Sequence, residues 1–476
     1  MSRATPEATR TFCHSRIAEG ALRTQWGRSG LVTSRFAFGG YRASVRSTQH
    51  KDALVQAIAS GCNVVDTSTN YTDGQSLDLV GAVVGVSVAV RPSIVIVSKV
   101  GYIQGSRLRE LKKQNSLTSS AKSELVVLDE DCWHCIHPEF IEQEITRTLQ
   151  KLQTDCIDVL LLHNPEYYLK TSQDRPEYER RIEAAFECLE KEVSKGRIAW
   201  YGVSSNTFVV GENDPEFTSL EHCWEAAKKA GGTDHHFLVA QMPFNLFEVG
   251  AWFIPRASGL TTLQFAKRNG IVVLGNRPFN SFAKGQFRHL VEVKDSKLYK
   301  PNHLESCKRD AQSLESQIPG EAILPQSLQK KLRILNWLDS ISQKISDYGS
   351  WRDFIQTQFN PAWDAIVKEA SSHSQAQLWL EQHDKYIRAY IDAITLHKLH
   401  IDAKACKDLK SILTETAVAL SSSATLSQML LRVYAGTTGM NVILVGMRHV
   451  NYVSDVMSAA EPLDFSSVEA CYKRFL

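Results

Sequence analysis

Short runs of β-branched and leucine residues recur along the chain, and each ends at a turn residue or a helix-like pattern. Such continuous apolar runs are typical of strands buried on both faces, as in a parallel sheet. Between them, apolar positions at helical spacing predict amphipathic helices. Eight strands alternating with helices predict an α/β protein with a (β/α)8 TIM barrel. The strands are expected to end near Gly40, Asp66, Lys99, His163, Ser204, Gln241, Leu274 and Val445, and the helices to cover 52–60, 138–152, 180–195, 219–230, 260–269 and 426–434.

The intervals between these strand ends match one βα unit except in two places. Additional polar residues between Lys99 and His163 predict an extended loop after strand 3. The far longer interval from Leu274 to Val445 carries apolar residues at helical spacing, including an apolar stripe over 328–345. It predicts a large helical insertion between strands 7 and 8. The predicted domains are an N-terminal arm over 1–21, the barrel over 22–290 and 421–476, and a helical insertion over 291–420 packed on the barrel.

Charge and hydropathy exclude some classes of partner. The chain has 54 Lys+Arg and 52 Asp+Glu, for a formal net charge of +2. This balance argues against binding to nucleic acid or a membrane surface through bulk charge. No apolar stretch approaches the ~20 residues of a membrane span. We therefore expect neither a nucleic-acid partner nor a membrane partner.

The ten cysteines are scattered, and several lie inside apolar runs. This distribution is typical of reduced intracellular thiols rather than of a disulfide framework. It favours a cytoplasmic location. Arginines outnumber acids in the N-terminal segment, which leaves a mitochondrial location as the alternative.

Four ionisable residues lie at or near three consecutive predicted strand ends: Asp66, Tyr71, Lys99 and His163. Active sites of (β/α)8 barrels form at this end of the strands. A tyrosine can donate a proton to a carbonyl oxygen that receives hydride, and a neighbouring lysine is expected to lower the tyrosine pKa. A carboxylate would keep that lysine charged, and a histidine could hydrogen-bond the carbonyl.

The segment Cys132-Trp133-His134-Cys135-Ile136-His137 places two thiols and two imidazoles within six residues. A zinc site and a redox pair are open alternatives. However, no second ligand pair follows at zinc-ribbon distance, and the segment directly precedes a predicted helix. We therefore expect a substrate loop or a packing segment, and no metal site.

Several motifs resemble those of aldo-keto reductases. Residues 61–71 (GCNVVDTSTNY) resemble the family's G-x-N-x-x-D-T-A-x-x-Y signature, and residues 196–204 (GRIAWYGVS) are similar to its G-K-I-R-x-x-G-V-S. The segments resembling further motifs follow in the family's order at 98–101, 161–163, 241–245, 276–278 and 445–455.

The resemblance implies an NADP-dependent oxidoreductase. On this basis Tyr71 is the proton donor, Lys99 and Asp66 adjust the pKa of Tyr71, and His163 positions the substrate carbonyl. Arg448 would contact the 2′-phosphate, which favours NADP. The residues implied to bind the cofactor are Ser204, Ser205, Asn206, Gln241, Asn276, Arg277, Gly446, Met447, Arg448 and Asp455.

The expected reaction is hydride transfer between the nicotinamide and a small-molecule carbonyl or alcohol, such as an aldehyde, ketone or sugar. One alternative is a sugar 1-dehydrogenase that works oxidatively with NAD(P). Another is a cofactor-binding regulatory subunit with the same fold. The helical insertion offers a docking surface for a protein partner in that case.

Overall fold

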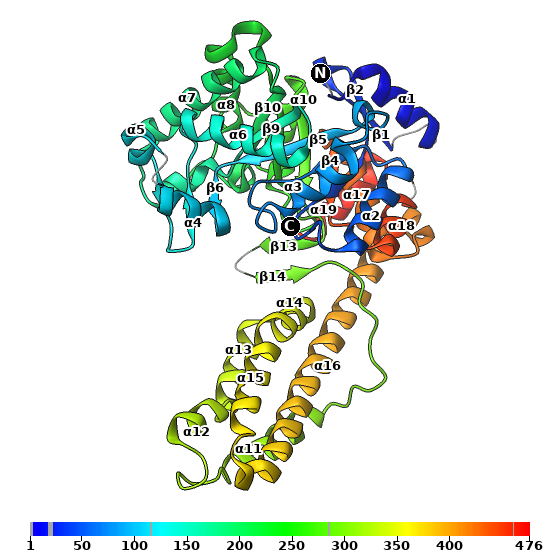
Figure 1. Ribbon diagram of the computed structural model, residues 1–476. Helices are drawn as coiled ribbons and strands as arrows, with labels where there is room; N and C mark the ends of the chain where they lie inside the picture. Colours follow the sequence, from blue (N-terminus) through cyan, green and yellow to red (C-terminus); the bar gives the residue numbers. More distant parts are fainter. Residues whose placement is uncertain (1–2, 18–21, 115–116, 284–285, 460) are drawn as a thin grey trace. The chain divides into compact units, whose positions relative to one another are not determined.

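The computed structural model describes residues 3–17, 22–114, 117–283, 286–459 and 461–476. The chain divides into two compact units (Figure 1). The first comprises Met1–Pro278 and Thr416–Leu476, and the second comprises Phe279–Glu415.

In the first unit, the described residues form a closed barrel of eight strands, which confirms the predicted fold class. Neighbouring strands are parallel, and β15 pairs with β3 to close the barrel. The barrel strands are β3 (Phe36–Gly39), β4 (Val64–Asp66), β5 (Val95–Val100), β9 (Ile157–His163), β10 (Ile198–Ser204), β11 (Phe237–Pro243), β12 (Val272–Asn276) and β15 (Val442–Val445).

Buried aliphatic side chains from successive strands form one cluster. Burying one such side chain contributes about 1.5–3 kcal/mol. Because these strands are covered on both faces, they are apolar at almost every position. The cluster includes Val64, Val95, Val97, Val159, Leu161, Val239, Val272, Leu274 and Val442.

Helices follow the barrel strands, and most begin at a side chain that accepts a hydrogen bond from a first-turn N–H. Ser47, His137, Asp174, Ser219 and Thr425 act in this way. The helices are α2 (Thr48–Ala59), α3 (Gln75–Val80), α6 (Pro138–Leu152), α7 (Arg175–Ser194), α8 (Leu220–Gly231), α9 (Gly250–Phe253), α10 (Thr262–Arg268), α17 (Leu426–Gly436), α18 (Val450–Met457) and α19 (Phe465–Lys473).

The segment after β5 is more ordered than the predicted loop. Leu108 and Leu111 are the buried residues of an otherwise charged helix, and they are too few to reveal it from polarity alone. A three-stranded sheet in the order β6-β8-β7 accompanies it. The elements are β6 (Tyr102–Gln104), α4 (Gly105–Gln114), α5 (Ser119–Ser123), β7 (Val126–Val127) and β8 (Cys132–His134).

The predicted N-terminal arm contains a helix, α1 (Pro6–Arg16). Thr5 caps it, and Phe12 and Cys13 are buried. It packs against β2 (Leu31–Ser34), which pairs with β1 (Arg23–Trp26) in an antiparallel hairpin.

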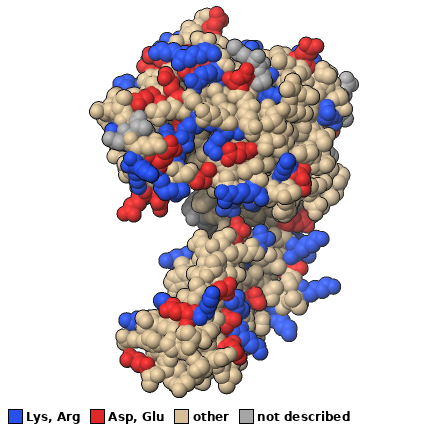
Figure 2. Space-filling model, in the orientation of Figure 1, with Lys and Arg blue, Asp and Glu red and all other residues tan. Residues whose placement is uncertain are grey.

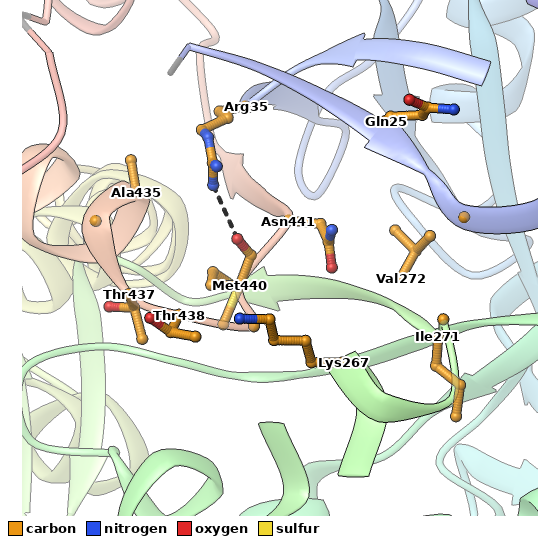
Figure 3. A pocket seen from close by; sticks show the side chains of 14 residues that line it. Gln25, Arg35, Lys267, Ile271, Val272, Ala435, Thr437, Thr438, Met440 and Asn441 are labelled. Carbon is orange, nitrogen blue, oxygen red and sulfur yellow. Dashed lines mark hydrogen bonds between the residues drawn. The ribbon is translucent and has the colours of Figure 1, made fainter. Parts of the chain in front are cut away.

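A pocket of about 410 Å³ lies among the β1–β2 hairpin, the start of β12 and the loop before β15 (Figure 3). There, Arg35 donates a hydrogen bond to the Met440 carbonyl at 2.9 Å, and Lys267 also lines the pocket. Arg35 precedes β3 and Met440 precedes β15, so the pocket lies at the amino ends of the barrel strands.

Among its described residues, the second unit contains helices and a hairpin of β13 (Asn280–Ala283) and β14 (Gln286–His289), and the helices were expected for the insertion. Its core contains the buried indoles of Trp351 and Trp363. The apolar stripe predicted over 328–345 spans two helices. The helices are α11 (His303–Glu315), α12 (Gln326–Leu332), α13 (Leu335–Lys344), α14 (Tyr348–Phe354), α15 (Asn360–Ala370) and α16 (Gln377–Thr416).

None of the helices in the described ranges is both long and apolar enough to cross a membrane. On the face shown in Figure 2, basic and acidic side chains are interspersed. This distribution agrees with the near-neutral net charge of the sequence.

Candidate active site

Three neighbouring strands bring the four predicted catalytic residues to one end of the barrel. Asp66 ends β4, Lys99 lies near the end of β5, and His163 ends β9. Tyr71 follows β4 in a turn. Lys99 is fully buried, and Asp66 is 3 % exposed. This is the carboxyl end of the parallel strands, where barrel enzymes place their active sites.

Lys99 is the centre of this group. Its Nζ donates hydrogen bonds to Asp66 Oδ2 at 2.7 Å and to the Tyr71 hydroxyl at 3.1 Å. A third bond goes to the Thr67 carbonyl at 3.1 Å. The three donors of the ammonium are therefore all used, and their directions hold the Tyr71 hydroxyl in place.

The pKa of Tyr71 differs from the sequence-based expectation. Burial raises it well above its usual value, and the nearby Asp66 carboxylate raises it further. Burial also lowers the pKa of Lys99, against the opposing effect of Asp66. Loss of hydration thus outweighs the expected lowering by the ammonium, and Tyr71 is a neutral phenol at physiological pH.

His163 is also neutral at physiological pH. Burial lowers its pKa well below the usual value, and Lys99 and His134 lower it further. Its Nδ1 lies 3.2 Å from Ser68 Oγ, and its ring centroid is 6.1 Å from that of Tyr71. A neutral imidazole next to the phenol can orient a polar oxygen without competing with Lys99 for Asp66.

Gln241 connects this group to residues predicted to bind the cofactor. Its Nε2 donates to Asp66 Oδ1 at 2.8 Å. Its Oε1 accepts hydrogen bonds from Ser204 Oγ at 3.2 Å and Asn276 Nδ2 at 3.3 Å. Side chains from four strands therefore form one network, which the chain order alone does not reveal.

Two atoms beside this network are suited to a polar ligand. Asn276 Oδ1 and Arg277 Nε are buried without a hydrogen-bond partner among the described residues. Arg277 has φ 54° and donates to Asn206 Oδ1 at 3.3 Å. It also lies 3.3 Å from Glu248. Buried polar atoms without partners are costly, so they favour a ligand that would complete them.

Gly446 to Arg448 follow the last barrel strand. A Cβ added at Gly446 would meet nothing within 4 Å, so the backbone here is open to a ligand. Met447 is fully buried. Arg448 lies close enough to His50 on α2 to affect its pKa. Burial lowers the pKa of His50, and the Arg448 charge lowers it further.

Asp455 has a different environment. Its Oδ1 accepts a hydrogen bond from Thr425 Oγ1 at 2.8 Å, and Thr425 caps α17. This contact joins α18 to α17. The predicted contact between Asp455 and the cofactor stays a prediction.

Three tyrosines that the motifs did not indicate lie around the Tyr71–His163 pair. The Tyr102 ring lies 4.6 Å from the His163 ring and 5.2 Å from the Tyr167 ring, while Tyr41 contacts Tyr71 edge-on at 5.4 Å. Tyr102 and Tyr167 follow Lys99 and His163 by three and four residues. Their positions shortly after predicted strand ends are the sequence feature that could have revealed them.

The Cys132–His137 segment forms contacts in several directions. His134 Nε2 donates to the His163 carbonyl at 2.7 Å, and burial lowers its pKa to about 4. Cys132 accepts from Gln104, and His137 caps α6. No cluster of three or more potential metal ligands occurs within the described ranges. The segment supports the backbone of the active site.

Comparison with protein families identifies the class of this barrel. The profile of the aldo/keto reductase family matches residues 35–336. The chain belongs to this family.

Several solved structures are similar to this chain at low sequence identity. The glycerol dehydrogenase AKR11B4 from Gluconobacter oxydans is 15% identical, with a TM-score of 0.50 and coverage of 96% of this chain and 97% of that chain. The holo form of aldo-keto reductase AKR11C1 from Bacillus halodurans is 15% identical, with a TM-score of 0.47 and 95% coverage of both chains.

An aldo/keto reductase from Klebsiella pneumoniae, solved in complex with NADP and acetate, is 14% identical. Its TM-score is 0.46, and the match covers 95% of both chains. No curated protein matches this chain.

Proposed function

We propose that the protein is an NADP(H)-dependent oxidoreductase that interconverts a small-molecule carbonyl and its alcohol. The observation that carries this proposal is the contact of the Tyr71 hydroxyl with Lys99 at 3.1 Å, beside the buried Asp66. His163 lies next to the same phenol.

The neutral state of Tyr71 supports the reductive direction. A neutral phenol holds the proton that a carbonyl oxygen needs when it becomes an alcohol. After donating it, the phenolate faces the Lys99 ammonium, which stabilises the new charge. Asp66 keeps the ammonium in place, and His163 orients the carbonyl oxygen.

The residues beside the catalytic group are suited to a nicotinamide. Gln241 accepts hydrogen bonds from Ser204 and Asn276. Together with the unpartnered Asn276 Oδ1 and Arg277 Nε, these side chains would hold the carboxamide of the nicotinamide. A bound nicotinamide would supply or accept the hydride.

Arg448 supports the choice of NADP over NAD. Its guanidinium can bind a phosphate through two parallel hydrogen bonds. The open backbone at Gly446 would admit the adenosine phosphates next to it.

A binding and turnover screen tests the proposal. Purified protein is titrated with NADPH and NADH while its tryptophan fluorescence is recorded, and it is then supplied with aldehydes, ketones and sugars. We expect quenching by NADPH at micromolar concentration and oxidation of NADPH by at least one carbonyl class. Absence of quenching by both cofactors would contradict the proposal.

Two further parts of the proposal concern the setting of the enzyme. The cytoplasmic location follows from the scattered cysteines, all of which are free thiols in the structure. A protein partner would bind residues 291–420, where Trp337 is 47% exposed and Leu378 is 72% exposed. Fractionation of cells and affinity purification would test these two predictions.

A further inference from the structure

Glu166 is a buried acid that the proposed reaction does not use. It lies in the 3-10 helix η4 (Pro165–Lys170), three residues after His163, and is 1% exposed. Asn164 has φ 54°, and its N–H donates to the Ser204 carbonyl at 2.7 Å. This turn brings Glu166 next to the segment that follows β10.

The Glu166 carboxyl holds that segment. Its Oε1 accepts a hydrogen bond from the Asn206 backbone N–H at 2.9 Å, and the nearby Ser205 side chain favours the ionised form of the carboxyl. Arg277 donates a hydrogen bond to the Asn206 side chain at 3.3 Å. Asn206 is therefore held through its backbone by one charged residue and through its side chain by another.

A chain of hydroxyl groups continues from the same turn. Ser205 Oγ lies 3.1 Å from Thr207 Oγ1, which lies 2.9 Å from Thr218 Oγ1. The Tyr178 hydroxyl is 2.8 Å from Thr218 Oγ1. These contacts restrict the side chain of Ser205.

Within the described residues, the Glu166 carboxyl lacks the cation that usually accompanies a buried acid. Its Oε2 has no hydrogen-bond partner among the described residues, and no ion pair to it occurs there. Burial raises its pKa to about 7. The titratable groups that face it are Glu216 before α8, Tyr178 on α7, Cys223 on α8 and Tyr102 on β6.

A buried carboxyl without a cation destabilises a fold, so a contribution to stability does not explain the presence of Glu166. We propose that Glu166 is a positioning residue, whose carboxylate holds the Ser204–Asn206 turn in the conformation that receives the nicotinamide. This inference rests on the proposed function, since these residues belong to the proposed cofactor site.

The proposal implies a pH dependence with a definite sign. A hydrogen bond from an N–H to a carboxylate is stronger than one to a neutral carboxyl group. Glu166 is ionised above a pH of about 7, so the turn is held best there. Cofactor affinity should therefore fall as the pH decreases through neutrality.

The test compares wild type, Glu166→Gln and Glu166→Leu. Glutamine keeps an acceptor for Asn206 N–H but cannot titrate, whereas leucine removes the acceptor. NADPH affinity is measured by fluorescence titration at about pH 6 and about pH 8. At each pH, the NADPH affinity of wild type is divided by that of Glu166→Gln. Titration of the ligand's own phosphate affects both proteins equally and cancels in this ratio.

We expect this ratio to rise about fivefold from the lower to the higher pH. Glu166→Leu should bind NADPH about tenfold more weakly than wild type at the higher pH. Glu192→Gln is the matched control, because Glu192 is equally buried but pairs with Lys195 and Arg197, which precede β10. It should leave the affinity unchanged.

The outcomes separate the two proposals. If wild type binds neither NADPH nor NADH, the proposed function fails. If wild type binds NADPH but the ratio is the same at both pH values, the role of Glu166 is refuted and the proposed function stands. Should Glu166→Leu fail to fold, the Glu166→Gln ratio decides alone.

Discussion

At the scale of single residues, the chemistry depends on how burial changes each ionisable group. Lys99 and Asp66 are deeply buried and satisfy each other. Tyr71 gains a donor but loses hydration, so it keeps its proton. The residue types were evident from the sequence, whereas the direction of the tyrosine pKa shift required the structure.

Tyr71→Phe tests the proton donor. We expect turnover to fall by about 10²–10⁴-fold because the proton for the carbonyl oxygen is lost, while NADPH affinity stays nearly unchanged. Steady-state kinetics and fluorescence titration check this. The matched control is Tyr472→Phe, which removes a buried hydroxyl that bonds Thr437. Unchanged turnover in Tyr71→Phe would contradict the assignment.

Arg448→Ala tests the choice of cofactor. Loss of a guanidinium from a phosphate should weaken NADPH binding about tenfold or more, with little effect on NADH. Fluorescence titrations with both cofactors measure the difference. Arg109→Ala removes an exposed arginine from α4 as the control. An equal loss for NADH and NADPH would remove the argument for NADP.

At the scale of elements, the site depends on a close approach between β5, β8 and β9. Gly101 follows β5 with φ 151°, and a Cβ there would lie 2.6 Å from His134 Nε2 and 2.8 Å from the His163 carbonyl oxygen. Only glycine fits between them. The turn therefore allows His134 to bind the end of the strand that carries His163.

Gly101→Ala should consequently displace His134 or the end of β9. We expect the free energy of unfolding to fall by about 1–3 kcal/mol and kcat to fall with it. Thermal denaturation and steady-state kinetics measure both. In the control Gly211→Ala, the new methyl group meets nothing within 4 Å and φ is ordinary, so neither quantity should change.

Helices and strands were predicted well where the apolar pattern of the sequence was local and strong. The predicted ends of β4 and β9 coincide with Asp66 and His163, and α6 has the predicted bounds Pro138–Leu152. The sequence pattern did not reveal α4, since only two of its residues are buried. The stripe over 328–345 hid a break between α12 and α13.

At the scale of the whole molecule, two units have separate hydrophobic cores. The barrel core is mainly aliphatic side chains from the strands, and the core of the helical unit includes Trp351 and Trp363. Because each unit has its own core, we expect each to unfold in a cooperative transition of its own.

Calorimetry with and without NADPH tests this organisation. A ligand that binds only one folded unit raises the Tm of that unit alone. We expect two transitions, and saturating NADPH should shift only the one assigned to the barrel. The barrel transition is assigned independently of the ligand with Gly101→Ala, which should lower the Tm of that unit. An equal shift of both transitions would contradict independent unfolding.

The barrel, the helical insertion and the four residues at three strand ends could be predicted from the sequence, because apolar periodicity and motif spacing are local properties of the chain. The folded structure was needed to reveal the network from Asp66 through Gln241 to Ser204, and the contact of Glu166 with Asn206. It also decided the protonation of Tyr71. These features depend on distances and dehydration between segments far apart in the chain, which no local pattern records.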